Sequence, residues 1–226
     1  MKLQRIRKLH RFFHDTEGLF GANAVLAAGL GLPFVIIASG TLKNAAAISL
    51  STYCAIVPSV IVGALIAKKA SEWIKWMIIP CVALLGAYLS RFIIRELSPA
   101  IFDSLGMYLP LLAVNSMIFN RSIGPNADRP LYRALASGIL YCGGFALVTL
   151  TVAAIREFLG SGSLWGVALS PYKFPAALTV FSGFILLGFL MAGARGAHRF
   201  FNFVNYRLDN PSPATLKRQE AERMVD

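Results

Sequence analysis

The stretch Ala134–Ile155 reads ALASGILYCGGFALVTLTVAAI and contains no Asp, Glu, Lys or Arg. A helix needs about 17–25 residues to cross the hydrocarbon core of a bilayer, so this stretch is long enough to span it. The whole chain of 226 residues is 56% hydrophobic and only 15% charged, against about 25% charged residues in an ordinary soluble domain. Six charge-free stretches account for this composition: Gly18–Leu42, Asn44–Ala67, Trp76–Ser90, Ser104–Asn120, Ala134–Ile155 and Phe174–Ala194.

These stretches predict an all-α integral membrane protein with six transmembrane helices. Trp76–Ser90 is short, but the long side chains of Arg91 and Arg95 can reach the interface and extend this span to about Ile94. A membrane β-barrel would alternate apolar and polar residues, whereas these runs are continuous. The alternative is a soluble protein with six buried helices, but the short polar connections leave no chain to shield those helices from water.

The basic residues indicate how the helices are oriented. The formal net charge is +11, and 17 of the 22 Lys and Arg residues lie in the two termini and in the second and fourth connections. Basic residues in short connections mark the cytoplasmic side. We therefore expect a multi-pass protein of a bacterial inner (plasma) membrane with both termini in the cytoplasm. Because topology accounts for most of the positive charge, no nucleic-acid partner is expected.

The sequence divides into three parts. Residues 1–17 form a basic segment that we expect to lie on the cytoplasmic leaflet, attracted by anionic lipid. Residues 18–200 form the transmembrane domain, and residues 201–226 form a polar cytoplasmic tail. A cleaved signal peptide is disfavoured, because the first apolar run is too long and no clear cleavage site follows it. The apolar residues of the first segment recur at helical spacing: Leu3, Ile6, Leu9 and Phe13.

Two spans carry a proline in a similar setting. The first contains Gly29-Leu30-Gly31-Leu32-Pro33-Phe34 and the fourth contains Gly106-Met107-Tyr108-Leu109-Pro110-Leu111, in which glycine, leucine and proline match. This predicts two inverted three-helix repeats, about 18–95 and 104–195, with interrupted first and fourth helices, as in many translocating membrane proteins. A plain proline kink is the alternative. The residues expected at the helix breaks or along an ion path are Gly31, Pro33, Pro110, Asn115 and Ser116.

Little in the sequence indicates catalytic chemistry. The cysteines Cys54, Cys81 and Cys142 lie in three different spans without metal-site spacing, so we expect them to act as small apolar residues. No catalytic residue and no metal ligand is predicted. No acidic residue is expected deep in a span. The similar pairs Arg95-Glu96 and Arg156-Glu157 are both expected to mark the outer interface.

Three passages resemble the Rnf/Nqr family of membrane subunits, most closely the E subunit of Rnf and the D subunit of Nqr. Gly29–Pro33 resembles the family's Gly-Leu-Cys-Pro, and Leu105–Ser116 resembles L-G-x-x-[LIV]-P-L-[IL]-x-x-N-C. Ile155–Gly166 resembles R-E-x-[LIF]-G-x-G-[ST]-L-[FW]. The resemblance covers about two-thirds of the chain. It implies a six-span subunit of a complex that couples electron transfer to Na⁺ or H⁺ movement.

At two positions the sequence differs from the family it resembles. In the family, two such subunits in opposite orientations hold a [2Fe–2S] cluster through the cysteines of the first two passages. Here Leu32 and Ser116 occupy those positions. Leucine cannot ligate iron, and serine is a poor substitute for a thiolate. We therefore expect no cofactor.

The sequence leaves three hypotheses open. The first is a cluster-free paralogue with a structural or ion-path role, bound to other membrane subunits that include a paralogous six-helix subunit. The second is a stand-alone inverted-repeat transporter or channel that binds a solute between Pro33 and Pro110, with Ser39 and Thr41 also near the path. The third is a cluster that uses Cys54 or Cys142 instead.

Overall fold

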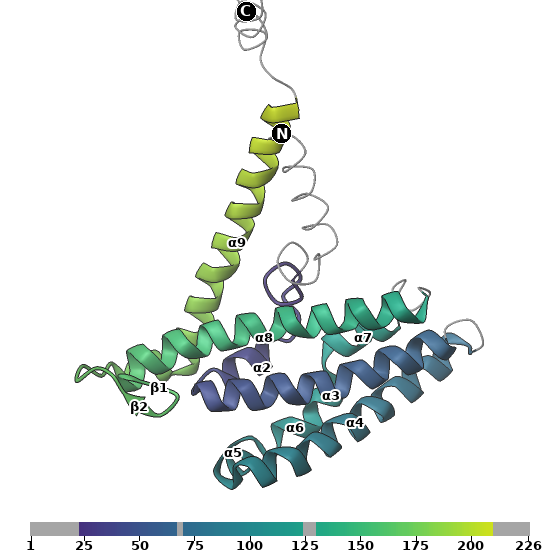
Figure 1. Cartoon of the computed structure of the whole chain (residues 1–226), viewed down its shortest axis with the longest axis horizontal. Coiled ribbons are helices and arrows are strands. Elements are labelled where there is room, and N and C mark those ends of the chain that lie inside the picture. Colours follow the sequence, from purple (N-terminus) through teal and green to yellow (C-terminus); the bar gives the residue numbers. More distant parts are fainter. Residues whose placement is uncertain (1–22, 67–69, 124–129, 210–226) are drawn as a thin grey trace, which may run out of the picture.

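The computed structural model describes residues 23–66, 70–123 and 130–209, and these are mostly helical (Figure 1). Four helices are long and apolar enough to cross a membrane: α3 (Leu42–Ile66), α4 (Glu72–Leu97), α8 (Leu131–Ser161) and the Val180–Ala197 part of α9 (Val180–Asp209). The described chain is thus an all-α membrane protein apart from one small hairpin. Its remaining elements are α2 (Leu32–Ala38), α5 (Pro99–Leu105), α6 (Tyr108–Leu111), η1 (Leu112–Val114), α7 (Ser116–Ser122), β1 (Ser163–Leu164), β2 (Val167–Ala168) and η2 (Pro175–Leu178).

The second and fifth predicted spans are confirmed as the helices α3 and α8. Three of the four predicted ends agree within three residues, and α8 continues six residues beyond Ile155. The third is confirmed as α4, which continues past Arg91 and Arg95 as predicted and ends at Leu97, three residues beyond Ile94. It also begins four residues before Trp76, at Glu72. The sixth begins later than predicted, because residues from Phe174 to Thr179 form η2 and its flanks rather than regular helix. Helix α9 then continues to Asp209, beyond its apolar part.

The fourth predicted span is an interrupted helix. The segments Pro99–Leu105 and Tyr108–Ser122 are bent by 58° at their break and together are long enough to form a fifth span. The first predicted span includes residues 18–22, which lie outside the described residues, and its described part contains only the short helix α2. Six spans therefore remain a prediction, as do the roles of segments 1–17 and 201–226. Residues 1–17 and 210–226 lie outside the described residues, and 201–209 are the end of α9.

Helix α3 lies at the centre of the bundle, between α4 and α8 (Figure 1). Glycines permit these close contacts. A Cβ atom on Gly86 of α4 would collide with the backbone carbonyl of Cys54 on α3, and one on Gly63 of α3 would collide with the carbonyl of Ser122 on α7. The Ser51 and Ser90 hydroxyls of α3 and α4 lie 2.8 Å apart and are buried. Small residues and interhelical hydrogen bonds are the usual means of packing helices in lipid, where the hydrophobic effect contributes little.

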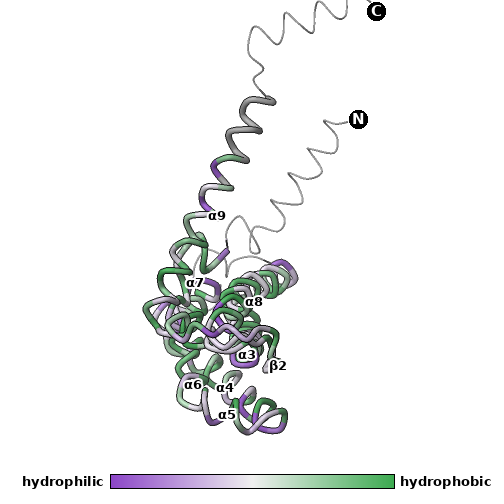
Figure 2. The backbone as a smooth tube through the Cα atoms, turned by 90° about the vertical axis from the view of Figure 1, so that its left-hand side faces the viewer, coloured by the Kyte–Doolittle hydropathy of each residue, from purple (hydrophilic) through white to green (hydrophobic). Residues whose placement is uncertain are grey.

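Helix α9 is packed differently. Only 11% of its apolar window is buried within the chain, against 56% for α3. Figure 2 shows α9 rising out of the bundle, with hydrophilic residues on its distal part. Its described contacts with the rest of the chain lie in about its first half, from Gly183 against Arg156 and the buried Leu187 to Arg195, which donates to the Ala27 carbonyl at 3.4 Å.

Candidate functional site

The first predicted break lies around Asn23 and Gly31. Asn23 is buried, its side-chain amide nitrogen donates to the carbonyl of Gly144 on α8 at 2.9 Å, and its side-chain oxygen accepts from the Val25 amide at 2.9 Å. The chain then turns through Gly31, whose φ of 73° favours glycine, and α2 begins at Leu32. Pro33 lies in the first turn of α2, where a missing N–H costs nothing. The break is therefore made by the residues before Pro33, and the proline starts the helix that follows.

The second break lies at Asn115. This residue is extended, separates η1 from α7 and caps α7, with its side-chain oxygen accepting from the Met117 amide at 3.1 Å. Pro110 lies inside α6, three residues after the 58° bend at Gly106–Met107 and five residues before Asn115, so the fourth predicted span is interrupted on both sides of it. An asparagine side chain at the N-cap accepts a hydrogen bond from an N–H of the first turn that has no partner within the helix. Asn115 is only 3% exposed, and its side-chain amide nitrogen has no hydrogen-bond partner among the described residues.

The two breaks meet inside the bundle. A Cβ atom on Gly31 would lie 2.7 Å from the Met117 sulfur and 3.3 Å from a ring carbon of Phe145. Phe145 is near the middle of α8, about 21 Å from its first residue and about 24 Å from its last at 1.5 Å per residue. The structure thus brings Gly31 close to Met117, two residues after Asn115, near the middle of α8, a position that we call mid-depth.

The two short helices that begin at these breaks run toward opposite ends of the bundle. Helix α2 follows its N-cap Gly31. Near its other end, the Ile36 carbonyl accepts a hydrogen bond from Arg156, which lies near the end of α8. Helix α7 starts at Asn115 and ends at Ser122, whose carbonyl meets Gly63 near the end of α3. The other predicted residues are more peripheral: Pro33 and Ser116 are exposed, and Leu32 and Pro110 are partly buried.

The side chains at the family's cluster positions do not fit an iron–sulfur cluster. Leu32 has no donor atom and packs against the hydrophobic core, while Ser116 offers one exposed hydroxyl. The three cysteines lie on α3, α4 and α8, and Cys142 is buried with its sulfur 4.0 Å from the Thr52 carbonyl. Within residues 23–66, 70–123 and 130–209, no three His, Cys, Asp or Glu side chains are grouped for a metal.

Arg156 and Glu157 lie in the last turns of α8, at the end of a span as expected, but their side chains are enclosed by the protein. Arg156 is 3% exposed and Glu157 is 4% exposed. Arg95 and Glu96, by contrast, are exposed. The two dipeptides have the same local sequence features, and the difference comes from the segments that fold around the end of α8.

Every N–H of the Arg156 guanidinium has an acceptor. Nε donates to Ala177 at 3.1 Å, and Nη2 donates to the carbonyls of Leu178 at 2.7 Å and Thr179 at 3.0 Å. Nη1 donates to the Ile36 carbonyl at 3.0 Å and to the Ser39 hydroxyl. A guanidinium has five such donors, so burial leaves none of them unpaired. The side chain thereby joins the end of α2 to the start of α9.

Glu157 joins two other segments. One carboxylate oxygen accepts from the amide of Leu42, the first residue of α3, at 2.5 Å. The other accepts from the amide of Gly166 at 3.0 Å. Trp165 and Gly166 form the two-residue turn of the β1–β2 hairpin with φ values of 58° and 82°, as a type I′ turn requires. A carboxylate that accepts backbone N–H groups at a helix start also complements the helix dipole.

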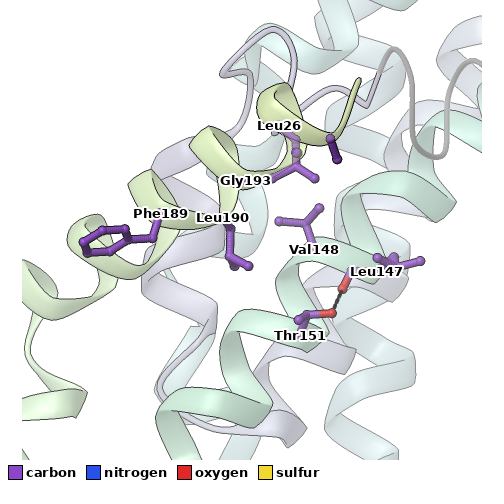
Figure 3. Close-up of a pocket in the computed structure, with 9 residues that line it drawn as sticks. Leu26, Leu147, Val148, Thr151, Phe189, Leu190 and Gly193 are labelled. Atoms are coloured by element: carbon purple, nitrogen blue, oxygen red, sulfur yellow. Dashed lines mark hydrogen bonds between the residues drawn. The ribbon is translucent and has the colours of Figure 1, made fainter. Parts of the chain in front are cut away.

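An apolar groove of about 360 Å³ lies between α8 and α9 (Figure 3). Leu26, Val148 and Leu190 point into it, and the Thr151 hydroxyl donates to the Leu147 carbonyl at 2.7 Å rather than into the groove. The described residues that line the groove are thus apolar, apart from Thr151, whose hydroxyl is already paired.

Comparison with known proteins assigns the family. Residues 12–191 match the family model described as "Rnf-Nqr subunit, membrane protein". The chain is 28% identical over 211 residues to the E subunit of the ion-translocating oxidoreductase complex of Pseudomonas paraeruginosa, covering 85% of both chains. It is 27% identical over 217 residues to the protein of the same name from Shewanella loihica, covering 88% of this chain and 89% of the relative. The chain therefore belongs to the Rnf-Nqr family of membrane subunits and is a homologue of the E subunit of ion-translocating oxidoreductase complexes.

Proposed function

We propose that this protein is a cluster-free membrane subunit of an ion-translocating electron-transport complex, with a structural or ion-path role. The observation that carries the proposal is the contact between the two breaks at mid-depth, where Gly31 lies against Met117. This framework is present although Leu32 and Ser116 stand where the family resemblance implies cysteine ligands. The protein would shape a path or hold neighbouring subunits in place, while electrons pass through cofactors bound elsewhere in the complex.

The proposal includes six spans in two inverted repeats, about 18–95 and 104–195. The opposite directions of α2 and α7 support this arrangement. Two repeats that are inverted in the membrane place corresponding short helices at the same depth and point them in opposite directions. With the basic residues of the even connections inside, both termini lie in the cytoplasm of a bacterium whose inner membrane holds the protein.

The proposed partners are other membrane subunits, including a paralogous six-helix subunit. Relatives of this chain are named as subunits of an ion-translocating oxidoreductase complex. The low internal burial of α9 supports an assembly, because a spanning helix with so few contacts in its own chain is stabilised by neighbours or by lipid.

The test is purification of the tagged protein from its native membranes under mild detergent. We expect redox subunits and a second six-span subunit to co-purify. The chain expressed alone is expected to contain no iron or acid-labile sulfide above the level of an unrelated membrane protein. Purification without redox partners, together with solute uptake by proteoliposomes of the single chain, would instead support the stand-alone transporter. Stoichiometric iron in the single chain would support a cluster that uses Cys54 or Cys142.

A further inference from the structure

Arg156 and Glu157 hold the two sides of a two-residue break between α2 and α3. The break consists of Gly40 and Thr41, between Ser39, which caps the C-terminus of α2, and Leu42, the first residue of α3. Arg156 binds the preceding side through the Ile36 carbonyl and the Ser39 hydroxyl. Glu157 binds the following side through the Leu42 amide. Two consecutive residues of a single long helix thus fix both ends of this break.

Helix α2 depends on such external contacts for its position. It has seven residues, and isolated helices of this length are not stable by themselves. Its first residue follows the left-handed Gly31, whose contact with Met117 belongs to the mid-depth break. In its last turn, the Ile36 carbonyl accepts a hydrogen bond from Arg156. Helix α2 is therefore a rod about 10 Å long that connects the end of α8 to the place where the two breaks meet.

The space around the guanidinium fits arginine closely. A Cβ atom on Gly183 of α9 would lie 3.2 Å from both Cζ and Nη1 of Arg156. The three remaining acceptors, which are the carbonyls of Ala177, Leu178 and Thr179, belong to the connection between the hairpin and α9. A lysine ammonium has three donors and no planar fork, so it cannot reach all five acceptors at once.

We propose that Arg156 and Glu157 are positioning residues that lock the Gly40–Thr41 break and thereby fix α2 against Met117 at the mid-depth break. Through Gly166 and Thr179 the same pair links this position to the hairpin and to the start of α9. The consequence for ion translocation rests on the proposed function, but the positioning itself is a property of this chain.

Hydrogen exchange of the intact protein in its native complex, followed by mass spectrometry, tests the proposal. The variants are Arg156→Lys, Glu157→Gln and the milder Ser39→Ala, which removes one acceptor and leaves the charge in place. Glutamine retains one side-chain oxygen but places an NH₂ group against a backbone N–H at the other position. Arg95→Lys and Glu96→Gln are matched controls, because that dipeptide has the same sequence and is exposed.

We expect exchange in residues 34–42 to accelerate at least about tenfold in Arg156→Lys and Glu157→Gln, and by less in Ser39→Ala. The middle of α3 and α4 is expected to change by less than about twofold, as is every segment in the two controls. A uniform acceleration across all helices would show a general stability role and overturn the proposal, as would unchanged exchange in residues 34–42. Loss of redox-driven ion uptake in Arg156→Lys tests the functional consequence. If the complex shows no such uptake at all, the proposed function fails while the exchange pattern still decides the positioning role.

Discussion

Gly31→Ala is expected to destabilise the protein through two separable effects. The first is backbone strain, because Gly31 has a φ of 73° and a left-handed conformation costs an ordinary residue about 1 kcal/mol. The second is overpacking, because the new methyl group would lie 2.7 Å from the Met117 sulfur and 3.3 Å from the Phe145 ring. Overpacking in a tight core costs about 1–3 kcal/mol. The expected loss in the free energy of unfolding is therefore about 2–4 kcal/mol.

A double-mutant cycle with Met117→Ala separates these effects. Met117→Ala alone is expected to cost about 2–5 kcal/mol, because Met117 is fully buried. In its background Gly31→Ala should lose the overpacking part and retain the backbone part, which gives a coupling energy of about 1–3 kcal/mol. Unfolding by SDS in mixed micelles, monitored by circular dichroism, measures all four proteins. Gly40→Ala is the matched control, since Gly40 has no left-handed φ and no described atom lies within 4 Å of the position that its new methyl group would take.

Two results would refute this account of the mid-depth contact. One is a Gly31→Ala variant as stable as Gly40→Ala, which would mean that the two breaks do not meet as described. The other is additivity of the two substitutions within about 0.5 kcal/mol, which would place Gly31 and Met117 apart.

Three further predictions concern other contacts. Gly86→Ala is expected to lower the free energy of unfolding by about 1–3 kcal/mol in the same SDS assay, because its methyl group would collide with the Cys54 carbonyl. Gly188→Ala on the open surface of α9 should change it by less than about 0.5 kcal/mol. Equal effects of the two variants would contradict the α3–α4 packing. Asn23→Ala should cost about 1–3 kcal/mol, since it removes a buried hydrogen bond to Gly144, and a neutral result would argue against the described first break. The double variant Leu32→Cys with Ser116→Cys, purified with its partner subunits, is expected to gain iron and acid-labile sulfide over the wild-type complex. Equal amounts in both would show that cysteines at these two positions do not suffice to hold a cluster.

The regular spans could be predicted from the sequence because hydropathy is a local property. The charge-free run Asn44–Ala67 corresponds to α3, whose described end at Ile66 agrees with it. The break at Asn115 is harder to predict from the sequence. Pro110 is the stronger sequence signal for a break, and the 58° bend lies close to it, between Leu105 and Tyr108. An asparagine that caps α7 two residues before Met117, the neighbour of Gly31, is recognised only once the two halves are folded together. The start of α9 is misplaced for a similar reason, since an apolar stretch does not distinguish η2 from a helix.

The burial of Arg156 and Glu157 could not be predicted, because their partners are distant in the sequence. Arg156 binds Ile36, which is 120 residues away, and Glu157 binds Leu42, which is 115 residues away. Short helices leave terminal carbonyls and amides unpaired, and in a membrane these groups need protein partners. Near the end of α8 lie the end of α2, the start of α3 and η2, and these offer such groups to Arg156 and Glu157. The buried charges and the unpaired helix ends therefore satisfy each other's hydrogen bonds, so each lowers the cost of burying the other.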